Sequence, residues 1–308
     1  MDSNQAAGSA AGAGKGAGST LPAGAIVVVV VVVIAVVAAA ALLFTGNSGG
    51  PGSTGGNGSG TDVIAQAFSS GQALTGAQLA NITEQYSKTV GPLNVTYMVN
   101  THATSSSPNF TDTTAGVLDE DYQRANGDFR ADIMMSALAN MHSPYYSNNV
   151  STKTQAVVIS FSNGTSYGCN KVLNITPPDP QLSKNFTCYK GIYSNNTLFN
   201  FSNPFGSTPY VKYRLVGKSS VLGIPCDILS GNGTLSTPAS LALNTTVNVR
   251  TCVSYKYLAW LNYSIDTIEH QSAHGLLSNS SSSGIATALN NRVSANLTQL
   301  PPGAIILP

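Results

Sequence analysis

Residues 117–135 read VLDEDYQRANGDFRADIMM, two strand-like runs on either side of Asn126-Gly127. Asn-Gly is the strongest two-residue signal for a hairpin turn, because both positions accept a positive φ. A second Asn-Gly, at 163–164, follows the strand-like run 156–161. The sequence therefore predicts successive antiparallel hairpins.

Before these hairpins, the spacing of apolar residues changes from a helical pattern to a strand pattern. Thr75 is a suitable N-cap, and Leu79, Ile82 and Tyr86 follow at helical spacing, so we expect a helix within 61–90. From Leu93 apolar and polar residues alternate, which is typical of a half-buried strand. Further strands are expected at 185–190, 210–217, 224–231, 246–256 and 258–268, and a closing helix at 286–300.

Residues 24–44 are apolar throughout and include seven consecutive valines. As a helix this segment is about 31 Å long, which matches the hydrocarbon core of a bilayer. The pattern predicts a retained transmembrane helix rather than a cleaved signal, whose apolar region is usually shorter. Lys15-Gly16-Ala17-Gly18 also resembles the processing site of archaeal type IV pilin-like signals, and cleavage there leaves the helix in place.

This segment divides the chain into four parts. Residues 1–23 are expected to be a disordered cytoplasmic or leader segment, 24–44 the transmembrane helix, 45–61 a Gly/Ser-rich linker, and 62–308 an extracellular, glycosylated, β-rich domain. Lys15 places the N-terminus inside by the positive-inside rule. The predicted location is the cell membrane, single-pass, with the C-terminal domain outside.

Fifteen N-x-S/T sequons follow the apolar segment and none precedes it. This asymmetry agrees with the predicted orientation and makes N-linked glycans expected partners. Glycosylated asparagines within strands must point away from the core. The sequons are at Asn57, Asn81, Asn94, Asn109, Asn149, Asn163, Asn174, Asn185, Asn195, Asn200, Asn232, Asn244, Asn262, Asn279 and Asn296.

The four cysteines, Cys169, Cys188, Cys226 and Cys252, all lie in the predicted exterior part. Three pairings exist for four cysteines. Sequence proximity favours Cys169–Cys188 and Cys226–Cys252, and each bond would stabilise the fold by about 3 kcal/mol in the chain-entropy model. The cysteine spacing contains no C-x-x-C, so structural disulfides are favoured over a metal site.

The bulk composition excludes some functions. Charged residues make up 9% of the chain and the formal net charge is +1, so no basic face suggests nucleic acid. The sequence contains no G-x-S-x-G, phosphate-binding loop or dinucleotide fingerprint. We therefore expect neither an enzyme nor a cofactor.

Three local clusters are best read as structural. His270 and His274 are one helical turn apart, but two ligands make an incomplete metal site. The triplet 119–121, Asp-Glu-Asp, alternates faces in a strand and is interpreted as solvated edge charge. Trp260 lies among Tyr255, Tyr257 and Tyr263, a cluster that suits either a sugar- or lipid-binding face or, more commonly, a core.

The hairpin at Asn-Gly-Asp-Phe-Arg-Ala-Asp-Ile, 126–133, resembles the returning strand of the LolA/LppX-like lipoprotein-carrier fold. The stretches Tyr-Gly-Cys at 167–169, Thr-Cys-Tyr at 187–189 and Leu-Gly-Ile-Pro-Cys-Asp-Ile at 222–228 are similar to exported archaeal proteins of that shape. The resemblance implies an α+β fold in which a curved antiparallel sheet, a half-barrel, packs on helices. It further implies that the concave apolar face holds a lipid or other hydrophobic ligand.

Two functions follow as hypotheses. The first is a membrane-anchored cell-surface binding protein for a hydrophobic ligand, tethered through 24–44. The alternative is a heavily glycosylated structural component of a cell envelope, surface filament or virion, which would have surface-assembly partners. Low charge and many sequons favour this alternative, whereas the resemblance favours the first.

Overall fold

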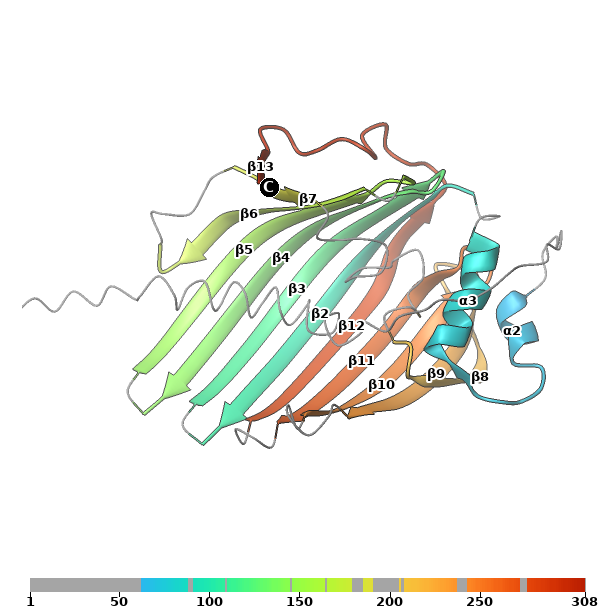
Figure 1. Ribbon diagram of the computed structural model, residues 1–308, viewed down its shortest axis with the longest axis horizontal. Coiled ribbons are helices and arrows are strands. Elements are labelled where there is room, and N and C mark those ends of the chain that lie inside the picture. The colour runs from blue at the N-terminus through green and yellow to red at the C-terminus, as the bar shows by residue number, and fades with distance from the viewer. Residues whose placement is uncertain are drawn as a thin grey trace, which may run out of the picture.

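The computed structural model describes residues 62–87, 91–108, 110–144, 146–163, 165–178, 185–190, 205, 208–236, 243–271 and 276–307. Two helices and thirteen strands lie in these ranges (Figure 1). They are α2 (Val63–Ala67), β1 (Leu74–Thr75), α3 (Gly76–Ser87), β2 (Leu93–Ser107), β3 (Phe110–Ala125), β4 (Asp128–Ser143), β5 (Tyr146–Ser160), β6 (Ser166–Thr176), β7 (Thr187–Lys190), β8 (Lys212–Val221), β9 (Ile224–Ser236), β10 (Leu243–Ser254), β11 (Ala259–Gln271), β12 (Leu276–Asn290) and β13 (Ile305–Leu307).

All thirteen strands belong to one sheet, in the order β1-β8-β9-β10-β11-β12-β2-β3-β4-β5-β6-β7-β13. Neighbouring strands are antiparallel except β7 and β13, which are parallel. The junction between β12 and β2 joins the two halves of the chain, so the sheet is completed by contacts distant in sequence. Both terminal strands are short, which limits pairing with another sheet edge.

The expected α+β class is wrong, because the described chain is almost entirely β. Its two helices have five and 12 residues, whereas β3 and β4 have 16 each. Both helices lie beside the β8–β11 part of the sheet (Figure 1) and form no layer across it. The predicted closing helix at 286–300 is also wrong: β12 continues to Asn290, where Ser- and Ala-rich chain pairs with β2.

The structure does not support the predicted single-pass location in the cell membrane. Across the ranges it describes, neither helix is long and apolar enough to span a bilayer. Residues 24–44, on which that prediction fell, lie outside the described residues, as do 1–23 and 45–61. We therefore withdraw the membrane-spanning prediction.

Local sequence explains why α3 begins where it does. The Thr75 hydroxyl accepts from the Gln78 backbone nitrogen at 3.2 Å, and the Gln78 side chain accepts from the Thr75 backbone nitrogen at 2.8 Å. This reciprocal pair is a capping box. Leu79, which the helical spacing singled out, is fully buried. The N-cap predicted at Thr75 is thus confirmed.

Two tight hairpin turns have their central residues at positive φ. Asn126 and Gly127 have φ of 55° and 84°, which confirms the predicted turn between β3 and β4. Between β8 and β9, Leu222 and Gly223 have φ of 53° and 74°. Leucine is poorly suited to this conformation, because its Cβ crowds the backbone.

Leu222→Asn is expected to raise the free energy of unfolding by about 0.5–1 kcal/mol, since asparagine tolerates positive φ. The leucine side chain is 52% exposed, so little buried contact is lost. Urea unfolding measures the change. The reciprocal variant Asn126→Leu, in the other turn, should destabilise by a similar amount; a stability gain there would contradict the explanation.

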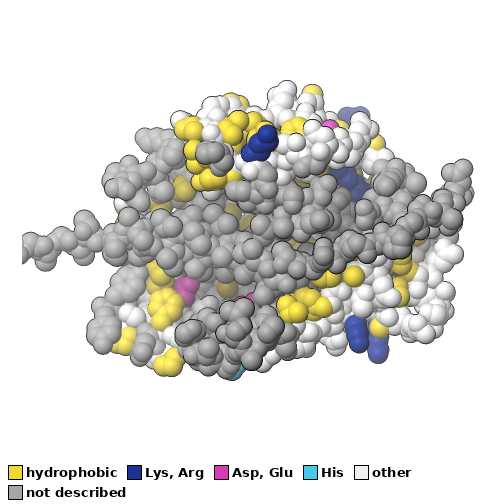
Figure 2. Space-filling view, viewed as in Figure 1, with side chains coloured by type: hydrophobic (Ala, Val, Ile, Leu, Met, Phe, Trp, Pro, Cys, Tyr) yellow, Lys and Arg dark blue, Asp and Glu magenta, His cyan; other side chains and the backbone are white. Residues whose placement is uncertain are grey.

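Few charged side chains appear in the space-filling view of Figure 2, where apolar and uncharged polar groups predominate among the described atoms. This agrees with a charged fraction of 9%. Burial of apolar surface and strand pairing, rather than ion pairs, are therefore the main sources of stability.

Candidate site on the inner face of the sheet

The sheet has two distinct faces. We call the face with Tyr97 and Leu118 the inner face, and the face with Met98 and Val117 the outer face. Side chains alternate between the faces along each strand. On β4 every inner residue from 131 to 141 is apolar and buried: Ala131, Ile133, Met135, Ala137, Ala139 and Met141.

The β9–β11 end of the sheet curves over the inner face of β2 and β3. The Tyr97 hydroxyl donates to the Trp260 carbonyl oxygen at 2.6 Å, and Arg124 donates to the Tyr257 carbonyl oxygen. The disulfide Cys226–Cys252 belongs to the same apolar cluster as residues of β2–β4. The inner face is therefore concave, and this end of it is closed by the protein itself.

The α2–α3 region fills a second part of the inner face. Ile64 and Leu79 from the helices pack against Tyr213 and Val247 on β8 and β10. The N-cap carboxylate of α2, Asp62, receives a 2.9 Å ion pair from Lys218 on β8. These contacts hold the helices on β8–β11.

A buried carboxyl, Glu120, interrupts the apolar inner face. It is 7% exposed, and the Tyr122 hydroxyl donates to it at 2.5 Å. Tyr97 packs edge-on against Tyr122 at 5.4 Å between ring centroids. Burial raises the pKa of Glu120 to about 7, although the Tyr122 hydrogen bond opposes the rise. Near neutral pH this carboxyl can therefore donate or accept a hydrogen bond.

At the opposite end of the inner face lies what we call the distal patch, formed by Ala139, Met141, Val150 and Ile175. The described hydrophobic residues of this cluster come from β4, β5 and β6, and Val172 on β6 packs against it. Asp112 pairs across strands with Met141. Burial raises the pKa of Asp112, and its Oδ1 has no hydrogen-bond partner among the described residues.

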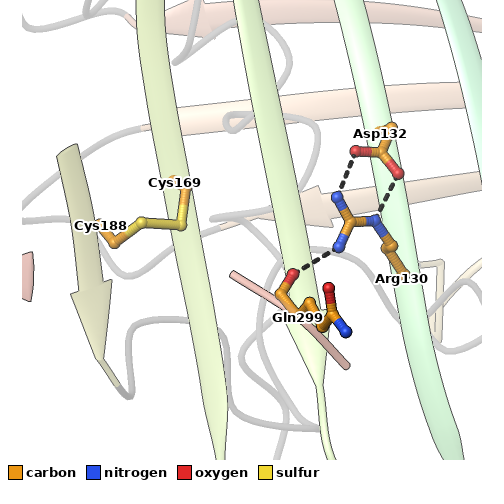
Figure 3. The surroundings of a disulfide bond; sticks show 5 residues. All are labelled: Arg130, Asp132, Cys169, Cys188 and Gln299. Atoms are coloured by element: carbon orange, nitrogen blue, oxygen red, sulfur yellow. Dashed lines mark hydrogen bonds and ion pairs between the residues drawn. A yellow bond between two sulfur atoms is a disulfide. The ribbon is translucent and has the colours of Figure 1, made fainter. Parts of the chain in front are cut away.

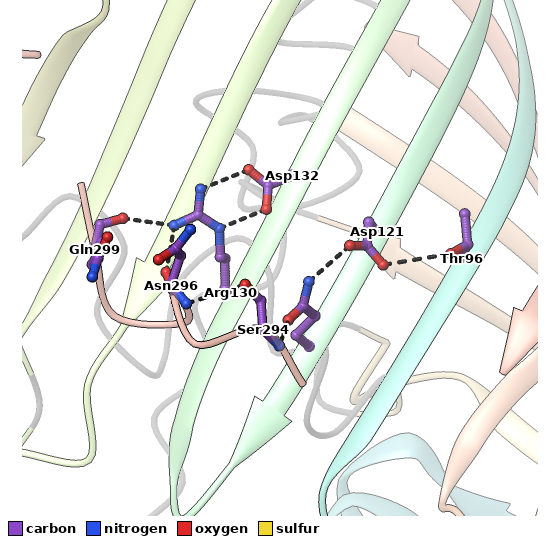
Figure 4. Close-up of polar contacts among 8 residues, drawn as sticks. Thr96, Asp121, Arg130, Asp132, Ser294, Asn296 and Gln299 are labelled. Carbon is purple, nitrogen blue, oxygen red and sulfur yellow. Dashed lines mark hydrogen bonds and ion pairs between the residues drawn. The ribbon is translucent and has the colours of Figure 1, made fainter. Parts of the chain in front are cut away.

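The outer face carries its own cover near the β3–β4 turn. Residues 291–304 cross it: Arg130 donates to the carbonyl oxygens of Asn296 and Gln299 at 3.0 and 2.6 Å while pairing with Asp132 at 2.6 Å (Figure 4). The Cys169–Cys188 disulfide lies on the same side (Figure 3). It joins β6 to the short strand β7, which lies between β6 and the edge strand β13.

The structure contains both disulfides, in the pairing that sequence proximity favours. Disulfides persist in oxidising compartments, which is consistent with a location outside the cytosol. Trp260 is buried and contacts Phe205, in agreement with the core interpretation of its aromatic cluster. His270 lies on β11, and His274 lies outside the described residues.

The interpretation of 119–121 as edge charge is wrong for its central residue. The triplet alternates faces as expected, but β3 lies inside the sheet and Glu120 points to the buried inner face. Sequence reasoning also did not single out Asp112. The signal available in the sequence was the alternation of faces along a strand. Asp112 and Glu120 are both an even number of residues from Leu118, so they share its face, which its apolar neighbours mark as the inner one.

Eleven of the fifteen sequon asparagines lie in described residues. Ten are exposed: Asn81, Asn149, Asn163, Asn174, Asn185, Asn232, Asn244, Asn262, Asn279 and Asn296. Asn94 is half-buried, and Asn57, Asn109, Asn195 and Asn200 lie outside the described residues. Glycosylation itself stays a prediction.

No protein-family model and no curated protein matches the sequence. Similar solved structures include a DUF1329 family protein from Desulfovibrio piger, at 13% identity over 73% of this chain and 96% of that one, TM-score 0.27. LprF from Mycobacterium bovis is 11% identical, over 71% of this chain and 94% of LprF, with a TM-score of 0.29. The translocator domain of autotransporter NalP from Neisseria meningitidis is 11% identical, over 75% of this chain and 97% of that domain, with a TM-score of 0.25. Likenesses at these TM-scores do not establish a shared fold.

Proposed function

We propose that this protein binds a lipid or other hydrophobic ligand on the inner face of its sheet. The observation that carries the proposal is the distal patch. Its residues lie on the concave inner face, where they continue the run of apolar side chains on β4 from Ala131 to Met141. An apolar, concave surface of this kind is typical of sites that hold hydrophobic ligands.

The polar groups of the inner face suit such a ligand. Ligand sites are typically apolar with a few placed polar groups that fix orientation. Asp112 lies at the distal patch and Glu120 lies farther along the same strand. A ligand whose chain covers Met141 can direct a hydroxyl or amide headgroup to the Asp112 carboxyl.

An assembling surface component has less support. Edge-to-edge growth of a sheet needs long unpaired edge strands. Here the terminal strands β1 and β13 have two and three residues. The binding function therefore accounts better for the described surface.

Organic extraction of the purified protein, followed by mass spectrometry, should release a lipid. Ala139→Trp is expected to reduce the amount bound on the order of tenfold, because the indole fills space at the distal patch. Leu138→Trp is the matched control: it is the neighbouring residue on β4, on the outer face and 46% exposed.

Unfolding curves of both variants must accompany the extraction, so that a loss of ligand is separated from a loss of fold. A folded Ala139→Trp protein that retains as much lipid as Leu138→Trp would contradict the proposal. So would a wild-type protein that yields no lipid at all.

A further inference from the structure

The sequons that lie within strands share one face of the sheet. Cross-strand partners have side chains on the same side, so the pairing register assigns each asparagine to a face. Seven sequon asparagines lie within strands. If each had no preference for either face, all seven would lie on the same face in about one case in 64. The seven outer-face residues are Asn94, Asn149, Asn174, Asn232, Asn244, Asn262 and Asn279.

These sequons are spread evenly, one on each of seven strands. The inner face also has strand asparagines, Asn148 and Asn170, and Asn170 is exposed, but neither is in a sequon. On β5 and β6 the sequons Asn149 and Asn174 lie at the strand ends away from the segment 291–304. Apart from half-buried Asn94, the strand sequons thus occur at exposed positions of the outer face.

A second observation is the apolar surface beside these asparagines. Ile268 is 46% exposed and pairs directly across strands with Asn279, while Ile285 is 41% exposed and pairs with Asn262. Met98, on the adjoining strand, pairs with Ile285 and is 44% exposed. Clustered exposed apolar residues of this kind are normally covered in soluble proteins.

We propose that N-linked glycans coat the outer face alone and that those on Asn262 and Asn279 shield the apolar side chains of β2, β11 and β12. The glycan attached to each asparagine extends over its cross-strand neighbour, since opposing Cβ atoms are about 5 Å apart. The inner face remains free of carbohydrate. This inference stands independently of the ligand proposal.

Glycopeptide mapping of the protein from its source organism tests the assignment. The exposed strand sequons, Asn149, Asn174, Asn232, Asn244, Asn262 and Asn279, should be occupied. Asn94 should be the least occupied, because it pairs with Gln123, whose side chain accepts a 2.7 Å hydrogen bond from Ser294 in the covering segment. Unmodified asparagine at all six exposed strand sites would overturn the proposal.

Engineered sequons test the difference between the faces. Val172→Thr creates a sequon at Asn170 on the inner face, and His142→Thr creates one at Asn140 on the outer face. In an N-glycosylating secretion host, the outer variant should gain one glycan at unchanged yield. The inner variant should stay unmodified or lose on the order of tenfold in secreted yield, because a glycan there prevents packing.

The double variant Asn170→Gln/Val172→Thr controls for the threonine itself and should recover the yield. Equal glycosylation and secretion of the two single variants would overturn the facial restriction. Asn262→Gln/Asn279→Gln should increase binding of an apolar dye and self-association, whereas Asn232→Gln/Asn244→Gln should not. Equal behaviour of these two pairs would overturn the shielding role.

Discussion

Gly76→Ala should lower the free energy of unfolding by at least about 2 kcal/mol, although alanine is the better helix former by about 1 kcal/mol. A Cβ on this first residue of α3 would overlap the carbonyl oxygen of Thr208. The Gly76 nitrogen also donates to the Val211 carbonyl oxygen at 2.8 Å, so the helix cannot simply move away. Urea unfolding of the two proteins gives the change.

Gly217→Ala on β8 is the matched control, because a Cβ there meets nothing within 4 Å. It should be neutral or slightly stabilising, since it removes backbone freedom from the unfolded chain. A stabilised Gly76→Ala protein would show that helix propensity outweighs the close approach. That result would contradict the packing described for α3.

The parts of the fold that sequence predicted are those decided within a few residues. The Asn126-Gly127 turn depends on two adjacent backbone conformations, and the Thr75 cap depends on Gln78 three residues later. Alternation from Leu93 likewise reflects one strand with one buried side. Short-range chemistry of this kind is readable without knowing the sheet order.

The missed parts are decided by partners distant in sequence. Residues 278–283 read SNSSSS, without apolar alternation, and become the centre of β12 because β11 and β2 pair on both sides. Glu120 is buried because the β9–β11 end curves over β2 and β3. Its neighbours in sequence, both acidic, gave no sign of this contact.

The distribution of sequons illustrates the same limit. Fifteen acceptor motifs are visible in the sequence, but their faces follow only from the register. The pairing register shifts at bulges at Lys153/Thr154, Cys252/Val253 and Ala286/Ala288. Beyond each bulge, odd-numbered and even-numbered residues exchange faces relative to the neighbouring strand. Counting residues from a turn would therefore have assigned several asparagines to the wrong side.

Glu120→Gln should remove a pH dependence of stability of about 4 kcal/mol, which follows from a folded pKa of about 7 and an ordinary unfolded value near 4.3. Between these two values the unfolded chain ionises this carboxyl while the folded protein keeps it protonated. Stability is therefore fully present below the unfolded pKa and is lost as pH rises through the folded one. Glutamine keeps an acceptor for the Tyr122 hydroxyl but does not titrate.

The test is the difference in unfolding free energy between wild type and Glu120→Gln, measured in urea at intervals from pH 4 to pH 8. Burial also raises the pKa of Asp227, Asp112 and Glu269, but these groups are common to both proteins and cancel in the difference. A wild-type-to-glutamine difference that stays constant with pH would mean that Glu120 is solvated, and the β9–β11 end would then not close over it.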